Sequence, residues 1–141
     1  MHPDRATVEA IFGLLENPDT TPAFFEHVAD DVEWTVMGTH PLAGTFTSKQ
    51  EYLDATFSQL GPLMRAGTHI KLSDLYVDGN TVIAELMTHS VTLEGAAFED
   101  GLCWICTFDG DRIVKARCYL DSAMVTWTIQ RNKPLVTTTT G

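Results

Sequence analysis

Two residues of this chain are of a type and in a place that could transfer a proton: Asp121 and His40. A carboxyl group can do so where a partly dry surrounding raises its pKa toward the working pH. A histidine can do so because it titrates near neutral pH. Asp121 closes the last long apolar run of the chain, and His40 lies in a loop beside Pro41, where polar residues often serve function.

Each of these residues also has a structural alternative, which the sequence leaves open. In residues 114–121 apolar and polar side chains alternate, so strict alternation places Asp121 on the face opposite to the core. Asp121 could then be the N-cap of a helix that begins at Ser122, unless a bend or bulge turns it toward a pocket. His40 could be solvated or could fix the conformation of its loop.

The other reactive side chains favour structural roles. The three cysteines, Cys103, Cys106 and Cys118, lie in apolar strand-like segments, which is typical of buried free thiols. Residues three apart on a strand point to opposite faces, so Cys103 and Cys106 cannot easily share a metal ion or a disulfide bond. The five histidines show no i, i+4 pair and no repeated ligand spacing. We therefore expect neither a metal nor a cofactor.

The composition indicates one globular domain. The formal net charge is −10, and the nine basic residues are scattered singly, which argues against binding to nucleic acid or to a membrane surface. No apolar run approaches the roughly 20 residues that span a bilayer. The N-terminus lacks the order of a secretory signal, so a cytoplasmic location is expected. We assign residues 1–132 to the domain and residues 133–141 to a polar, disordered tail.

The elements that would position these residues follow an α+β order. Apolar spacing predicts three helices in the first half, over residues 4–16, 21–30 and 48–64. Alternation predicts one strand between them, over residues 31–37, and four more from residue 68 to 121, separated by turns at residues 78–80, 94–95 and 109–111. A short closing helix is expected from Ser122 to Arg131. This order is typical of an α+β fold in which three N-terminal helices pack on a curved antiparallel sheet.

This arrangement resembles the SnoaL-like branch of the nuclear transport factor 2 superfamily. The resemblance covers about residues 4–125 and rests on the motifs Val32-Glu33-Trp34 and Pro41-Leu42-Ala43-Gly44, together with the run from Cys103 to Asp121. It implies a cone-shaped fold. This fold hosts isomerases, cyclases, epoxide hydrolases, dehydratases and plain binding modules, so the resemblance defines the fold better than the reaction.

One mechanism of this superfamily does not fit the chain. Alignment to the ketosteroid isomerases places Thr35 where those enzymes keep a basic aspartate, Trp104 where they keep a neutral aspartate, and approximately Phe12 where they keep a tyrosine. That mechanism needs a carboxylate to move the proton and two acidic donors to hold the enolate. None of the three residues can substitute, so this chemistry is excluded.

Two further comparisons separate the remaining chemistries. The limonene epoxide hydrolases use an aspartate, an arginine and an aspartate, which align with Leu86, Thr88 and Cys118, so their route of water activation is also excluded. The SnoaL-type polyketide cyclases use an aspartate at the end of the last strand as general acid and base. Asp121 matches that position approximately, so this resemblance implies Asp121 as the catalyst. The alignment does not place His40, which is a candidate because of its position in the loop alone.

The sequence therefore predicts a cofactor-independent isomerase, cyclase or ring-opening enzyme that acts on a small hydrophobic polyketide- or terpenoid-like molecule. Asp121 and His40 are the expected catalytic residues. Nine residues are expected to bind the substrate, although several could equally belong to the core: Trp34, Met37, Leu53, Phe57, Leu86, Thr88, Trp104, Cys118 and Tyr119. The alternative is a non-catalytic module that binds a small hydrophobic ligand in a cavity without an ionisable group. In both cases we expect a homodimer that forms through the outer face of the sheet.

Overall fold

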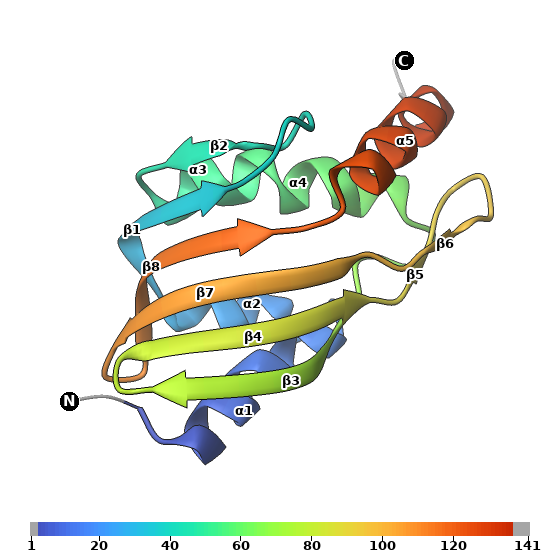
Figure 1. Ribbon diagram of the computed structural model, residues 1–141. Coiled ribbons are helices and arrows are strands. Elements are labelled where there is room, and N and C mark those ends of the chain that lie inside the picture. Colours follow the sequence, from blue (N-terminus) through green and yellow to red (C-terminus); the bar gives the residue numbers. More distant parts are fainter. Residues whose placement is uncertain (1–2, 137–141) are drawn as a thin grey trace.

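The computed structural model describes residues 3–136 and shows helices packed against one face of a curved sheet (Figure 1). The helices are α1 (Arg5–Gly13), α2 (Thr21–Glu26), α3 (Lys49–Ala55), α4 (Phe57–Leu60) and α5 (Ser122–Asn132), with 3₁₀ turns η1 (Leu14–Glu16), η2 (Gly61–Leu63) and η3 (Lys133–Leu135). The strands are β1 (Val28–Val36), β2 (Gly44–Phe46), β3 (Ile70–Asp78), β4 (Thr81–Thr88), β5 (Ser90–Val91), β6 (Ala97–Phe98), β7 (Gly101–Asp109) and β8 (Arg112–Tyr119). No helix among the described residues is long and apolar enough to cross a membrane.

The main sheet has six strands in the order β2-β1-β8-β7-β4-β3, and β5 and β6 form a separate two-stranded pair. The predicted α+β class is confirmed. The sheet is not antiparallel throughout, however, because β1 runs parallel to β8. These two strands are separated by most of the chain, so the long connection that a parallel pair requires is available. The sheet is therefore mixed.

The first strand begins earlier than the sequence predicts. β1 starts at Val28, which pairs with Ile113 of β8, and α2 has already ended at Glu26. The N–H of Ile113 donates to the carbonyl of His27 at 2.7 Å, so pairing with β8 extends the strand toward α2. Local apolar spacing cannot show this, because the partner strand lies far along the chain. At the other end, η3 occupies the start of the predicted tail, and residues 137–141 lie outside the described residues.

The predicted third helix is interrupted at Thr56. The Thr56 hydroxyl donates to the carbonyl of Tyr52 at 2.7 Å, and the Thr56 backbone leaves the helical region with φ −122° and ψ −81°. Such bonds from a threonine to the preceding turn often bend helices. At the start of α3, the Ser48 hydroxyl accepts from the N–H of Glu51, as the first residue of a capping box does. The Glu51 carboxylate instead accepts from the N–H of Thr47.

The main hydrophobic core lies between the sheet and the helices α1 to α3, and Trp34 is fully buried in it. The Trp34 ring stacks on Tyr52 at 4.1 Å between centroids and meets Trp104 edge-on at 5.3 Å. Its indole N–H donates to the sulfur of Cys118 at 3.0 Å. A second, smaller cluster lies toward α5 and consists of Leu42, Met64, Phe98 and Val125.

Candidate active site

A cavity opens where the two hydrophobic clusters meet, and residues of both clusters line it. Its wall is mostly apolar, and its polar members are Tyr52, Thr56, Thr68, Thr88 and Asp100. The space open to the centre of a water-sized sphere is about 60 Å³. A concave, mostly apolar site with a few convergent polar groups is the usual form of a small-molecule site.

Asp100 contributes a carboxyl group to this wall and is fully buried, with 0% of its surface exposed. It lies directly before β7 and is held against the end of β4 by Thr88. The Asp100 N–H donates to the Thr88 hydroxyl oxygen at 2.6 Å, and the Thr88 N–H donates to the Asp100 carbonyl at 3.0 Å. Backbone and side-chain bonds from a neighbouring strand therefore fix the position of this carboxyl group.

The two carboxyl oxygens of Asp100 differ in their surroundings. Oδ1 accepts a hydrogen bond from the backbone N–H of Asp121 at 2.9 Å. Oδ2 is buried and has no hydrogen-bond partner among residues 3–136, and the same holds for Oγ1 of Thr68, another residue of the cavity wall. Buried polar atoms are normally hydrogen-bonded, so these two atoms are available to a ligand in the cavity.

The electrostatics make Asp100 the group of the cavity wall that can change its charge near neutral pH. Burial raises the pKa of Asp100 to about 6; the bond from the Asp121 N–H opposes this, and the charge of Asp121 adds to it. Burial also raises the pKa of Tyr52 and of Cys118 well above their usual ranges. Both of these groups therefore stay protonated at neutral pH, and Cys118 is not an activated thiolate.

The structure places four of the nine predicted substrate-binding residues in the cavity wall: Phe57, Thr88, Trp104 and Cys118. The other five lie elsewhere among the described residues. Trp34 and Leu53 belong to the main core or pack against it. Leu86 is also buried in the main core, whereas Tyr119 is exposed and lines a separate hollow on the outer face of the sheet. Met37 is partly exposed.

The two predicted catalytic side chains do not line the cavity. Asp121 is exposed and is the N-cap of α5, where its carboxylate accepts from the N–H of Met124 at 3.2 Å. His40 is buried and fixes its loop: Nε2 lies 3.0 Å from the carbonyl of Met37, and Nδ1 accepts from the N–H of Leu42 at 3.1 Å. For Asp121 this is the structural alternative that the sequence left open, because strand alternation turns its carboxylate away from the core and only its backbone N–H reaches Asp100.

Asp100 was not predicted as a site residue, although the sequence contains a signal for it. Phe98, Asp100, Leu102 and Trp104 share one parity, and this is the parity that faces the core. A carboxyl group at an inward position of an apolar strand is costly to bury unless it has a function or a partner. What the sequence does not show is that β4, β7 and the start of α5 converge on this position.

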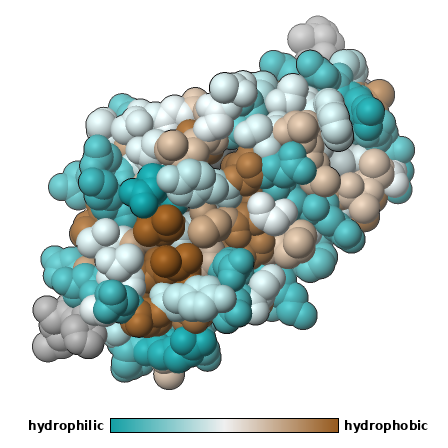
Figure 2. All heavy atoms as spheres, viewed as in Figure 1, coloured by the Kyte–Doolittle hydropathy of each residue, from teal (hydrophilic) through white to brown (hydrophobic). Residues whose placement is uncertain are grey.

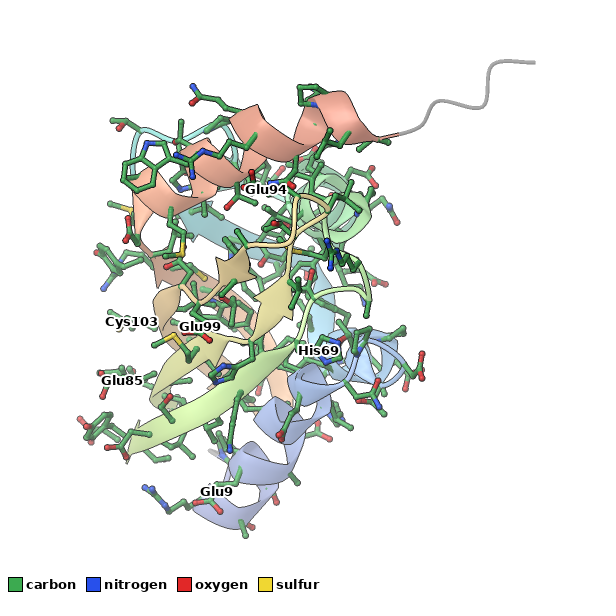
Figure 3. All side chains as sticks on the ribbon, turned by 90° about the vertical axis from the view of Figure 1, so that its right-hand side faces the viewer. Glu9, His69, Glu85, Glu94, Glu99 and Cys103 are labelled. Carbon is green, nitrogen blue, oxygen red and sulfur yellow. The ribbon has the colours of Figure 1, made fainter. Side chains whose placement is uncertain are left out.

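No cluster of metal-binding side chains is found in the part of the chain that the structure describes: no three His, Cys, Asp or Glu residues there are arranged to hold an ion. Glu85 and Cys103 lie on the outer side of the sheet, whereas Glu94 lies in the loop between β5 and β6, close to α5 (Figure 3). The three cysteines are free, and Cys106 is buried in the core.

The comparison with curated proteins finds a distant relative. No family model matches the chain. The dimerizing cyclase phiC of a fungal species (strain ATCC 74256) is 27% identical over 113 residues, which make up 77% of this chain and 50% of that protein. The chain thus spans about half the length of the curated relative that it matches.

Solved structures identify the fold. An NTF2-like protein from Burkholderia thailandensis superposes with a TM-score of 0.72 at 27% identity and covers 89% of this chain and 95% of that one. A protein with a ketosteroid isomerase-like fold from Catenulispora acidiphila, solved in complex with trimethylamine, has a TM-score of 0.66 at 15% identity and covers 89% and 93%. The chain is an NTF2-like protein, which confirms the resemblance to the nuclear transport factor 2 superfamily. The cyclase relative is consistent with the SnoaL-like branch.

Proposed function

We propose that this protein is a cofactor-independent acid–base enzyme, an isomerase or cyclase, that acts on a small hydrophobic polyketide- or terpenoid-like molecule, and that Asp100 transfers the proton. The observation that carries this proposal is the buried Asp100 carboxyl group, which faces an apolar cavity with one oxygen unpartnered. The name of the cyclase relative supports the same class of reaction.

The chemistry follows from the environment of this carboxyl group. A general acid or base works best when its pKa lies near the working pH, and burial raises the pKa of Asp100 to about 6. As a carboxylate, Asp100 would accept a proton from a carbon beside a carbonyl group and leave an enolate. The resulting carboxylic acid would return the proton to another carbon in an isomerisation. In an aldol-type cyclisation it would return it to the alkoxide that forms with the new C–C bond.

Two neighbours of Asp100 would have supporting roles. The backbone N–H of Asp121 stabilises the carboxylate form through its hydrogen bond to Oδ1, which leaves Oδ2 to face the substrate. The hydroxyl of Thr68, which has no partner among the described residues, would hydrogen-bond a carbonyl or hydroxyl oxygen of the substrate. In this proposal Asp121 acts through its backbone, and His40 positions its loop.

The alternative, a non-catalytic module that sequesters a hydrophobic ligand, is favoured by the mostly apolar wall of the cavity. This alternative requires a cavity without an ionisable group, because a charge in the wall would oppose the binding of an apolar ligand. Asp100 counts against it.

The proposal can be tested with 5-nitrobenzisoxazole, a small apolar compound that opens when a base removes its ring C–H proton. The proton passes to the carboxylate, the N–O bond breaks, and the coloured cyanonitrophenolate is released, so no co-reactant is needed. We expect catalysis that increases with pH around a midpoint near 6, because the carboxylate is the active form. Asp100→Asn should lose about 100-fold or more of the rate.

The matched control is Asp121→Asn, which keeps the helix cap and the backbone N–H but removes the exposed carboxylate. It should retain most of the rate. If Asp100→Asn is as active as the natural protein, or if the loss occurs only in Asp121→Asn, Asp100 is not the base and the proposal is refuted.

We also propose that the protein forms a homodimer through the outer face of the sheet. Hydrophobic residues gather over β4 and β7 on this face (Figure 2). Register brings the outward side chains of Tyr76, Ile83, Ile105 and Arg117 into one row across β3, β4, β7 and β8. Light scattering should give twice the chain mass, and Ile105→Lys should give a monomer because it places a charge in the centre of this row. A natural protein that is monomeric at high concentration would contradict this.

A further inference from the structure

A second hollow lies outside the cavity, as a groove between the helix pair α4–η2 and the end of α5. The space open to the centre of a water-sized sphere is about 570 Å³ there, against about 60 Å³ in the cavity. Typical small-molecule sites measure about 300 to 1,000 Å³. The cavity that holds Asp100 is below this range, whereas the groove is within it.

Leu42 lines both hollows. It is only 6% exposed and belongs to the small hydrophobic cluster with Met64, Phe98 and Val125. On the cavity side it shares the wall with Val125 and Asp100, and on the groove side with Ile129 of α5. The side chain of Leu42 is therefore part of the partition between the groove and the cavity.

The loop that carries Leu42 is built around His40. The carbonyl of Met37 can only accept, so Nε2 of His40 carries the proton; Nδ1 then has the lone pair that accepts from the N–H of Leu42. Gly38 is needed in the same loop, because its φ is +114° and an added Cβ would lie 2.5 Å from the Ser122 hydroxyl at the start of α5. The backbone of Leu42 is thus held firmly, whereas its side chain lies between two spaces.

The groove differs from the cavity in its charge. The described residues that line it are apolar or neutral except for Lys133, which follows the C-terminal end of α5. The whole chain has a formal net charge of −10, so a groove whose lining charge is positive stands out from the rest of the surface. A positive charge in the lining of a mostly apolar groove favours a molecule with an apolar body and an anionic group.

We infer that the ligand of this protein is an elongated, mostly apolar molecule with an anionic group, and that it passes Leu42 so that its inner end reaches Asp100 and its anionic end lies beside Lys133. Leu42 is then a specificity-determining residue, because its side chain sets how much of a ligand can enter the cavity. This inference rests on the proposed function, since it takes the Asp100 cavity as the reacting end of the site.

The test uses dodecanoate as an anionic probe and dodecanol as its uncharged counterpart. Methyl NMR spectra should show that dodecanoate shifts both Leu102, in the cavity wall, and Ile129, in the groove wall. In Leu42→Trp, and in the smaller change Leu42→Phe, the shift of Leu102 should disappear while that of Ile129 remains. Leu42→Ala should enlarge the passage and tighten binding of dodecanoate about threefold or more, as expected when a bulky barrier is removed from an apolar site.

Two controls separate this effect from others. Leu75→Ala removes an equally buried leucine from the core, away from both hollows, and should leave dodecanoate binding unchanged. Lys133→Gln should weaken dodecanoate binding about threefold to tenfold without affecting dodecanol, because only dodecanoate carries the charge.

The inference is overturned if dodecanoate never shifts Leu102 in the natural protein, if Leu42→Trp and Leu42→Phe still allow that shift, or if Leu75→Ala changes binding as Leu42→Ala does. Equal effects of Lys133→Gln on both probes would refute the claim that the ligand has an anionic group beside Lys133. The elimination assay is independent of these results. A ligand that spans both hollows without any Asp100-dependent elimination would refute the proposed function alone, and the reverse result would refute this inference alone.

Discussion

Asp100→Asn tests the central electrostatic claim through protein stability. In the folded protein the pKa of Asp100 is raised from 3.8 to about 6, and burial is the main cause. A raised pKa means that the folded state holds its proton more tightly than the unfolded state. The resulting stabilisation is fully present below pH 3.8 and is lost as the pH rises through about 6.

The size of the effect follows from the shift. One pKa unit corresponds to about 1.4 kcal/mol, so about two units give at most about 3 kcal/mol, and less where solvent in the cavity screens the charge. Asparagine has nearly the same shape, and its side-chain oxygen can still accept from the N–H of Asp121. Any effect of the asparagine itself on the free energy of unfolding does not depend on pH. It therefore displaces the plot of the stability difference against pH without changing its slope.

The assay is urea unfolding of both proteins at several pH values between 4 and 7.5. The free energy of unfolding of the natural protein, minus that of Asp100→Asn, should fall by about 2 kcal/mol, mostly between pH 4 and about 6, and should be level above that. Asp78→Asn, which removes an exposed carboxylate at a turn, is the matched control and should not reproduce this dependence. A flat difference curve, or one that rises with pH, would refute the reasoning.

Three further substitutions test the local structure. Asp121→Ala should lower the free energy of unfolding by about 1 kcal/mol through loss of the α5 cap, whereas Asp121→Asn should be nearly neutral in urea titrations; equal losses would contradict the cap. Gly38→Ala should cost about 2 kcal/mol or more, because φ is +114° and the Ser122 hydroxyl is 2.5 Å from the added carbon; an unchanged melting temperature would argue against this geometry. Trp34→Phe should cost about 1 kcal/mol or more, because it removes ring volume and the N–H bond to Cys118; calorimetry showing no loss would contradict that packing.

Much of the fold could be predicted from local patterns. Helix and strand spacing located α1, α3, α5 and the four long strands from β3 to β8, and the resemblance identified the NTF2-like fold. The errors lie where distant parts of the chain decide the outcome. Pairing with β8 lengthens β1 and makes the sheet mixed, and a hydroxyl bond at Thr56 divides the predicted third helix.

The residues of the candidate site were harder to predict. The two candidates for proton transfer were predicted from residue type and position. In the structure, both ring nitrogens of His40 form hydrogen bonds within its loop, and the Asp121 carboxylate caps a helix. Asp100 could have been noticed from its parity with Phe98 and Trp104. Its function depends on contacts from β4 and α5, which no local pattern shows.

Alternation and apolar spacing act over a few residues, and for that reason the sequence alone determined the existence of most helices and strands and the α+β class. Burial, cavity shape and pKa depend on atoms brought together from Thr88, Asp100 and Asp121, which are distant in the chain. Only the tertiary structure could decide that the carboxyl group of Asp100, and not that of Asp121, faces the cavity. The alternation of β8 turns the Asp121 carboxylate outward, whereas the segment before β7 places the Asp100 carboxyl group in the buried interior.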